Sequence, residues 1–147
     1  MSKLASIVFL LDAIAIGLGA FGHGASVRHL HAAIDQFPID ADMHSMLYVV
    51  WYFVSGCMFA FGLMLIWVWQ RLRAGDRDSL TIAAAVGMLY VGIGAFGLVY
   101  RNGDPFMAMF VVLGGVLLIS GYVMSGPLIQ VRRGRRLSGS RDVLSRV

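Results

Sequence analysis

Four long stretches of the chain consist almost entirely of apolar residues, and shorter polar segments separate them. They cover residues 4–22, 46–69, 80–100 and 106–124. At about 1.5 Å per residue, a helix of this length spans roughly 30 Å, the thickness of a bilayer's hydrocarbon core. Isolated strands cannot satisfy their backbone hydrogen bonds in lipid, so each stretch is predicted to be a helix. The pattern predicts an all-α fold, a polytopic membrane protein with a four-transmembrane-helix bundle.

The composition of the chain supports this prediction. Apolar residues make up 59% of the 147 residues and charged residues 14%, whereas a soluble domain is nearer to half apolar and a quarter charged. A single cysteine excludes a fold held by disulfides. The net charge of +4 comes from basic residues in short stretches beside the apolar runs. No soluble basic domain is therefore present to bind nucleic acid, and the lipid bilayer is the expected environment.

Lysine and arginine are distributed unequally between the two sides of the predicted bundle. Ten lie on the side of the chain termini, and only Arg28 and Arg101 lie on the other. The positive-inside rule therefore predicts that both termini are cytoplasmic. Residues 127–147 form a basic cytoplasmic tail after the helical domain of residues 1–126. Four arginines of this tail are expected to contact anionic lipid headgroups: Arg132, Arg133, Arg135 and Arg136.

A glycine-rich sequence occurs twice in the chain. Residues 17–22 read GLGAFG and residues 92–97 read GIGAFG, so five of six positions are identical at an offset of 75 residues. Both match the G-x-G-x-x-G pattern of dinucleotide-binding proteins, but neither follows a strand or opens a helix, which excludes that interpretation. Glycines within membrane spans allow helices to pack closely. The motifs predict a tandem repeat of two helical hairpins, with chance similarity as the alternative.

One acidic residue, Asp12, lies at the midpoint of the first predicted span. A carboxyl group there costs about 2.5–3.5 kcal/mol on insertion scales, so we expect it to face the bundle and to have a partner. The polar groups at the same predicted depth are Ser55 and Tyr90. One interpretation is a structural polar cluster of these three residues. The other is the proton-binding site of a small transporter.

All four histidines fall within residues 23–44, on the predicted outer side. In this segment Val27, Leu30, Ile34 and Phe37 have helical spacing. They predict a short amphipathic helix over residues 26–37, which lies along the outer membrane interface with these apolar residues turned inward.

The same segment contains two candidate ligand pairs. His31 and Asp35 are four residues apart, a helical spacing that can hold a metal ion. His23 and His44 are predicted at similar depth on adjacent helices, as axial ligands of a haem or a pigment would be. The alternative interpretation is that these histidines form ordinary hydrogen bonds at the interface.

Several short motifs allow a comparison with a known group of proteins. They are Gly22-His23 at the end of the first span, Trp51-Tyr52-Phe53-x-x-Gly56 and Phe61-Gly62-Leu63 in the second, and the following arginine-bearing loop. In these features and in the layout of residues 1–126, the chain resembles small four-helix bacterial inner-membrane proteins of unassigned function. The resemblance implies a four-helix fold and a location in the bacterial inner membrane.

These observations favour a non-catalytic integral membrane protein, an accessory or structural subunit of a larger membrane complex. No complete catalytic set is recognisable, so an enzyme is not expected. The expected partners are other membrane subunits or further copies of the chain. The first alternative is a haem-, metal- or pigment-binding subunit for electron transfer or light harvesting that uses the outer histidines. The second is a small proton-coupled transporter that uses Asp12.

Overall fold

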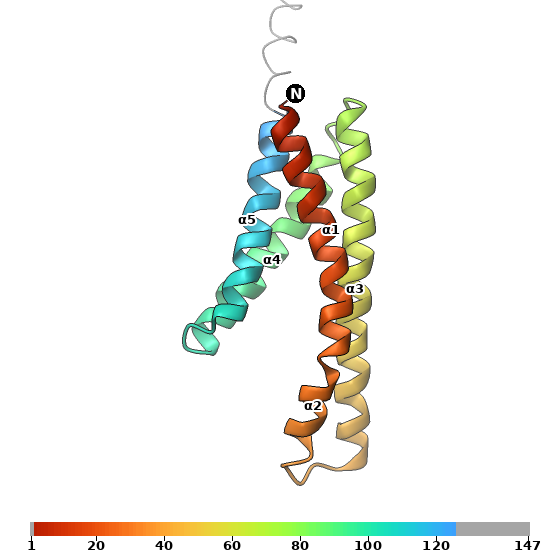
Figure 1. Cartoon of the computed structure of the whole chain (residues 1–147), viewed down its shortest axis with the longest axis vertical. Helices are drawn as coiled ribbons and strands as arrows, with labels where there is room; N and C mark the ends of the chain where they lie inside the picture. The colour runs from red at the N-terminus through yellow and green to blue at the C-terminus, as the bar shows by residue number, and fades with distance from the viewer. Residues whose placement is uncertain (1, 126–147) are drawn as a thin grey trace, which may run out of the picture.

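The computed structural model describes residues 2–125, and the regular structure within them is α-helical (Figure 1). The helices are α1 (Lys3–Ala25), α2 (Val27–Ile34), α3 (Ala41–Arg73), α4 (Leu80–Tyr100) and α5 (Pro105–Ser125). Four helical segments are long and apolar enough to cross a membrane, with α2 continuing the first of them. The predicted all-helical fold with four such helices is therefore confirmed. The predicted tail, with Arg132, Arg133, Arg135 and Arg136, lies outside the described residues.

Helix α3 is longer at both ends than the apolar pattern predicts. It has 33 residues and begins at Ala41 because the Asp40 carboxylate accepts a hydrogen bond from the Met43 amide at 2.7 Å. Residues 41–45 are mostly polar or small, so hydropathy alone does not include them. His44 therefore lies in the first turn of α3.

A tight turn joins α4 to α5. Asn102 and Gly103 have φ angles of 51° and 86°, the left-handed region that asparagine and glycine tolerate best. The Asp104 carboxylate accepts a hydrogen bond from the Phe106 amide at 2.9 Å and pairs with Arg101 at 2.9 Å. The turn therefore starts α5 and fixes α4 and α5 as an antiparallel hairpin.

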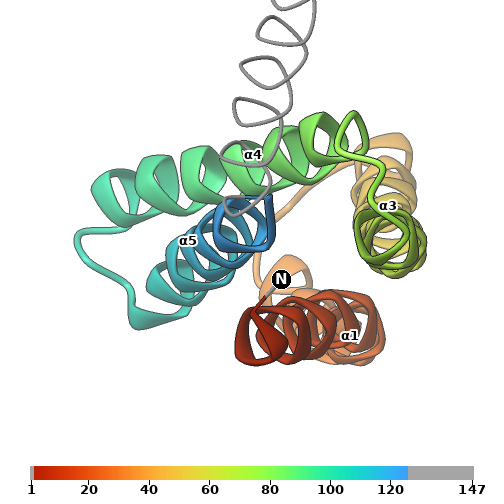
Figure 2. The ribbon, with the colours of Figure 1, turned by 90° about the horizontal axis from the view of Figure 1, so that it is seen from above.

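The long helices pack as two hairpins, α1 with α3 and α4 with α5, and α1 and α5 join them (Figure 2). Within each hairpin the backbones touch at glycines. A Cβ atom on Gly17 would lie 3.4 Å from the Gly62 Cα atom, and one on Gly114 would lie 2.6 Å from the Gly87 carbonyl oxygen. Such contacts are the common means of association in lipid, where apolar burial gives little driving force.

The buried core lies toward the end of the molecule that carries the N-terminus. Its fully buried large side chains are Phe9 and Ile16 of α1, Leu65 and Val68 of α3, and Leu117 of α5. Arg77 also donates a hydrogen bond to the carbonyl oxygen of Ser125 at 2.8 Å, which ties the α3–α4 connection to α5. Toward the opposite end the two hairpins diverge, and α1 and α3 continue without the second hairpin beside them (Figure 1).

Helix α2 follows α1 toward that diverging end, beside the first turns of α3 (Figure 1). Of the apolar residues expected on its inward face, Ile34 is buried, while Val27 and Leu30 are half-buried. Phe37 is 67% exposed, contrary to expectation. The helix ends at Ile34, with Asp35 as its C-terminal cap, so Phe37 no longer follows the helical period.

Candidate metal centre

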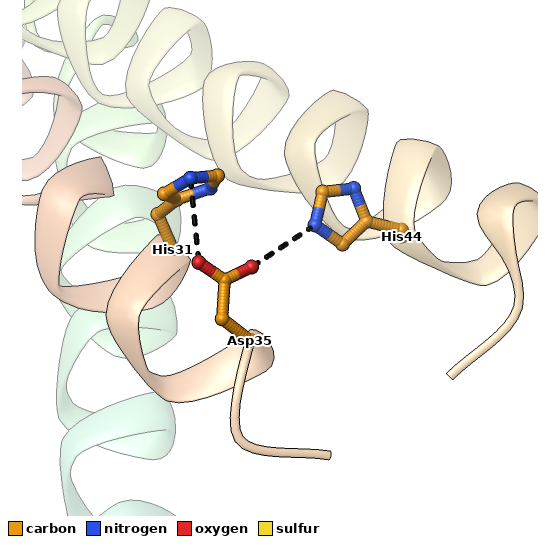
Figure 3. A group of neighbouring side chains, drawn as sticks. All are labelled: His31, Asp35 and His44. Atoms are coloured by element: carbon orange, nitrogen blue, oxygen red, sulfur yellow. Dashed lines mark ion pairs between the residues drawn. The ribbon is translucent and has the colours of Figure 1, made fainter. Parts of the chain in front are cut away.

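Three potential metal ligands meet where α2 ends and α3 begins: His31, Asp35 and His44 (Figure 3). The His31 Nε2 atom lies 3.5 Å from one Asp35 carboxylate oxygen. The His44 Nε2 atom lies 4.0 Å from the other. Each residue offers one potential ligand atom, and these three atoms all lie within 4.8 Å of one another. Asp35 thus stands between the two imidazoles.

The local sequence explains this convergence. His31 and Asp35 are four residues apart, so their side chains lie on the same face at the end of α2. The Phe37 amide donates a hydrogen bond to the Ile34 carbonyl oxygen at 2.9 Å, which starts the turn back toward α3. His44 lies in the first turns of α3 and reaches Asp35 from the other side. Two separate helices therefore supply the three side chains.

Tyr48 of α3 contacts both histidines of this group. Its hydroxyl is hydrogen-bonded to the Nδ1 atom of His31, and its ring centroid lies 5.0 Å from that of His44, which precedes it by one helical turn. When Nδ1–H donates to the tyrosine oxygen, the lone pair of His31 is on Nε2, the atom that faces Asp35. A hydrogen bond to the second imidazole nitrogen is the usual means by which proteins orient a metal-binding histidine.

The donor set of two imidazole nitrogens and one carboxylate oxygen suits Zn²⁺ and related divalent transition metals. Bond lengths of about 2.0–2.2 Å place the ligands of a tetrahedral zinc ion about 3.3–3.6 Å apart. Small side-chain rotations would bring the three ligand atoms to that spacing. The side chains of His31 and Asp35 are 59% and 56% exposed, which leaves room for water or another ligand at a fourth position.

The other predicted ligand, His23, lies in a different environment. Its Nδ1 atom is 2.9 Å from the Ser55 hydroxyl, and its ring stacks on Trp51 with centroids 4.3 Å apart. The Trp51 indole N–H also donates to the His23 carbonyl oxygen at 2.9 Å. Trp51 is seven residues beyond His44, about 10 Å along the helix axis. The structure therefore groups His23 and His44 with different partners and gives no support to axial ligation of one haem or pigment by this pair.

Of the predicted intramembrane polar cluster, Asp12 and Tyr90 are buried, with 6% and 3% exposure. One carboxylate oxygen of Asp12 and the Tyr90 hydroxyl have no hydrogen-bond partner among the described residues. Ser55 is not part of this group, because its hydroxyl is hydrogen-bonded to His23. Ser55 also faces Gly24, since a Cβ atom added to Gly24 would lie 3.6 Å from the Ser55 hydroxyl oxygen. The shared-depth argument fails for Ser55 because α1 and α3 pack in a register that puts Gly17 beside Gly62 and Ser55 beside His23.

Sequence reasoning missed two features of the candidate metal centre. It separated His44 from His31 and Asp35, and it did not select Tyr48. The spacing of four residues between His44 and Tyr48 was visible in the sequence. The sequence does not show, however, that the end of α2 comes to lie beside these two residues.

Comparisons with known protein families, with curated proteins and with solved structures find no match for this chain. Its function has to be inferred from its own residues and their arrangement.

Proposed function

We propose that the chain is a non-catalytic membrane protein that binds a divalent transition-metal ion, with Zn²⁺ the first candidate, through His31, Asp35 and His44. The observation that carries this proposal is the approach of three ligand atoms from two helices to within 4.8 Å of one another. Three protein ligands leave the fourth position of a tetrahedral zinc ion open.

A bound ion would join α2 to α3. Ile34 is the one buried residue of α2, so apolar packing contributes little to holding this helix in place. A metal ion shared between Asp35 at its end and His44 of α3 would supply the missing attachment. Metal binding would then order the segment between the first two long helices, because binding to a folded site stabilises the fold that contains it.

The test is a zinc titration of the purified, metal-free chain in detergent, with a chromophoric chelator as competitor. The expected result is one zinc ion per chain and at least about a tenfold loss of affinity in His31→Ala, Asp35→Asn and His44→Ala. The matched control is His29→Ala, because His29 is exposed on α2 and outside the ligand group. Equal affinities in His29→Ala and His44→Ala would contradict the proposal.

We also infer that the four long helices cross a membrane with both termini on one side. The support is the segregation of charge: Lys3, Arg71 and Arg73 belong to one end of the bundle, and Arg28 and Arg101 to the other. By the positive-inside rule the first end is cytoplasmic. Reporter fusions at both termini and in the α4–α5 turn would test this, and activity of a cytoplasmic reporter at the turn would contradict it. A bacterial inner membrane is the location that the sequence resemblance suggests.

The tandem repeat remains a proposal with partial support from packing. Gly19 and Gly94 are equivalent positions of the two glycine motifs, and each faces the partner helix of its own hairpin. A Cβ atom on Gly19 would lie 3.1 Å from Met58, and one on Gly94 would lie 2.7 Å from Val111. Gly92 has open space around it, whereas its counterpart Gly17 contacts Gly62, so the correspondence is incomplete.

Membership of a larger membrane complex also remains a proposal. A tagged chain extracted from its native membrane in mild detergent should migrate on a native gel with additional subunits. Migration as the single chain in its detergent micelle would count against an accessory role. The zinc titration tests metal binding separately, whatever the result of the native gel.

A further inference from the structure

A groove of about 790 Å³ lies between the two hairpins, toward the end where they diverge. Aromatic rings from three helices line this inter-hairpin groove: Trp51 and Phe61 of α3, Tyr90 of α4, and Phe106 and Phe110 of α5. Its volume lies within the range of about 300–1,000 Å³ that is usual for small-molecule and cofactor sites, whose walls are mostly apolar. The groove does not include His31, Asp35 or His44, so it is separate from the candidate metal centre.

The wall of the groove also contains His23, whose ring is held by two neighbours. The ring stacks on Trp51 with centroids 4.3 Å apart, and its Nδ1 atom lies 2.9 Å from the Ser55 hydroxyl oxygen. That hydroxyl donates its single proton to the Trp51 carbonyl oxygen at 3.2 Å. The His23 Nδ1–H is therefore the donor to Ser55, and the lone pair of the imidazole is on Nε2.

The Nε2 atom of His23 is accessible. It makes no hydrogen bond within residues 2–125 and is not one of their buried unpartnered atoms. An imidazole whose other nitrogen donates a hydrogen bond, and whose lone pair is accessible, has the arrangement of a metal-ligating histidine. Because His23 lines the inter-hairpin groove, the groove is the place where a ligand would meet this nitrogen.

A bare metal ion would find too few protein ligands at His23. Among residues 2–125, the group of three side chains that could hold an ion consists of His31, Asp35 and His44, without His23. A metal bound by His23 must therefore bring most of its other ligands with it. A haem does so, because its macrocycle holds the iron and the protein adds an axial ligand, for which histidine is a common residue.

The rest of the groove suits the body of such a molecule. Aromatic walls favour stacking and edge contacts with a flat ring, and the ring of Phe110 lies 5.7 Å from that of Tyr90 and 5.5 Å from that of Phe106. The other charged or polar side chains of the lining belong to the α1–α2 junction, α2 and the α4–α5 turn: Ser26, His29, Arg101 and Asp104. The carboxylate groups at the edge of a haem would lie among these residues.

We propose that the inter-hairpin groove binds a haem-type metallotetrapyrrole, with the His23 Nε2 atom as its axial ligand and Ser55 as the residue that orients the imidazole. The aromatic walls contact the macrocycle. This site goes beyond zinc binding and uses none of the proposed zinc ligands. It requires His23 without His44, which the structure groups with other partners.

The test is a titration of haem into the purified full chain in detergent at about pH 8, where histidine is neutral. Protein-free micelles are the blank. The expected result is saturation of the Soret band at one haem per chain, with at least about a tenfold loss of affinity in His23→Ala. His29→Ala is the matched control, because the exposed His29 lines the same groove. Its affinity for haem should equal that of the unmodified chain.

Ser55→Ala tests the orienting hydrogen bond. The affinity for haem should fall by about tenfold, the lower end of the usual loss for such a partner. The iron–histidine stretching band in the resonance Raman spectrum of the ferrous form should move to lower frequency, because the hydrogen bond makes the imidazole a stronger ligand. The same band should be absent in His23→Ala. An unshifted band in Ser55→Ala would show that Ser55 does not act on the ligand.

A second pair of variants tests the groove without altering His23. Ile93 lines the groove, so Ile93→Trp should fill part of it and weaken haem binding by about tenfold. Val99 on the same helix is 82% exposed and outside the groove, so Val99→Trp should bind as the unmodified chain does. Circular dichroism and size-exclusion chromatography show whether each variant is folded.

Unchanged haem affinity in folded His23→Ala would overturn the proposal, as would equal losses in His23→Ala and His29→Ala. Metal-free protoporphyrin separates coordination from burial of the ring. It should bind about tenfold more weakly than haem, and equal binding of the two would contradict axial ligation. If His23→Ala does not fold, the Raman band of the unmodified chain and the contrast between Ile93→Trp and Val99→Trp decide the question.

Haem and zinc binding are separable in the same set of variants. His44→Ala should lose zinc and keep haem, whereas His23→Ala should lose haem and keep zinc. Loss of haem binding in His44→Ala would overturn the groove as the haem site. Failure of this proposal and failure of the metal centre are therefore distinguishable.

Discussion

The Trp69 indole N–H of α3 donates to both the carbonyl and the hydroxyl oxygen of Ser6 in α1, at 3.0 Å in each case. This contact joins the two helices of the first hairpin near the end that carries the N-terminus. It satisfies the polar atom of a half-buried aromatic side chain, whose ring also carries the Arg73 guanidinium 4.8 Å from its centroid. Together with the close approach of Gly17 and Gly62, it fixes the register of α1 against α3.

Trp69→Phe removes this hydrogen bond and keeps an aromatic ring at the position. We expect the free energy of unfolding in detergent to fall by about 1 kcal/mol, the usual value for a hydrogen bond between membrane helices. Trp67→Phe is the matched control, because Trp67 is 48% exposed. Equal losses in the two variants, measured by denaturant titration, would mean that the Ser6 contact does not stabilise the hairpin.

Gly62→Ala should destabilise the same interface more strongly. The added Cβ atom would lie 2.7 Å from the Gly17 backbone nitrogen, and a backbone atom cannot move aside as a flexible side chain can. Overpacking of this kind costs about 1–3 kcal/mol. Gly56→Ala on the same helix is the control, since a Cβ atom there has open space. A Gly62→Ala chain as stable as Gly56→Ala would show that the two helices do not pack at this point.

Tyr48→Phe should weaken zinc binding without abolishing it. The three ligands remain, but His31 loses the hydroxyl that orients its ring. Loss of such a partner reduces metal affinity by about 10- to 100-fold. The chelator competition should still show one zinc ion per chain. Unchanged affinity would indicate that Tyr48 does not support the His31 ligand.

The connection between α3 and α4 should respond to acid through Asp76. Desolvation would raise the pKa of Asp76, but hydrogen bonds from the Arg71 guanidinium and the Asp78 amide hold it below its usual value. A lowered pKa means that the carboxylate stabilises the fold at neutral pH and that this contribution disappears as the pH falls through the lowered value.

The prediction is checked with Asp76→Asn. The variant should be less stable than the unmodified chain at pH 7, and the difference should shrink below about pH 4 as the native carboxylate becomes protonated. Unfolding measured by denaturant over this pH range gives the comparison. A difference that does not change with pH would show that the Arg71–Asp76 ion pair is not its cause.

The long apolar helices could be predicted from the sequence because each depends on a local property, the run of apolar residues. The first turn of α3 does not follow from this property, because it depends on the capping carboxylate of Asp40 and contains mostly polar or small residues. The expected neighbours of His44 and Ser55 were wrong for another reason, because they depend on how far α3 is shifted along α1. In the observed register Ser55 lies beside His23, eleven residues along α1 from Asp12.

The register between helices depends on contacts that no single segment reveals. The two motif glycines Gly17 and Gly92 have the same sequence surroundings, yet the first touches Gly62 and the second faces open space. The pairing of Trp69 with Ser6 likewise joins residues that are 63 positions apart. The pair His31 and Asp35 could be predicted from the sequence because both belong to α2 and its C-terminal cap. The third candidate ligand, His44, comes from α3 and could not.

The length of α3 has a consequence for access to the proposed metal centre. A helix of 33 residues is about 50 Å long, whereas the hydrocarbon core of a bilayer is about 30 Å thick. With its arginine-bearing end held at one surface, the first turns of α3 would project into the water beyond the opposite surface. Zinc would then reach His44 by diffusion through the aqueous phase, without crossing the bilayer. A chelator that cannot penetrate membranes should be able to remove it from intact vesicles with this end outward.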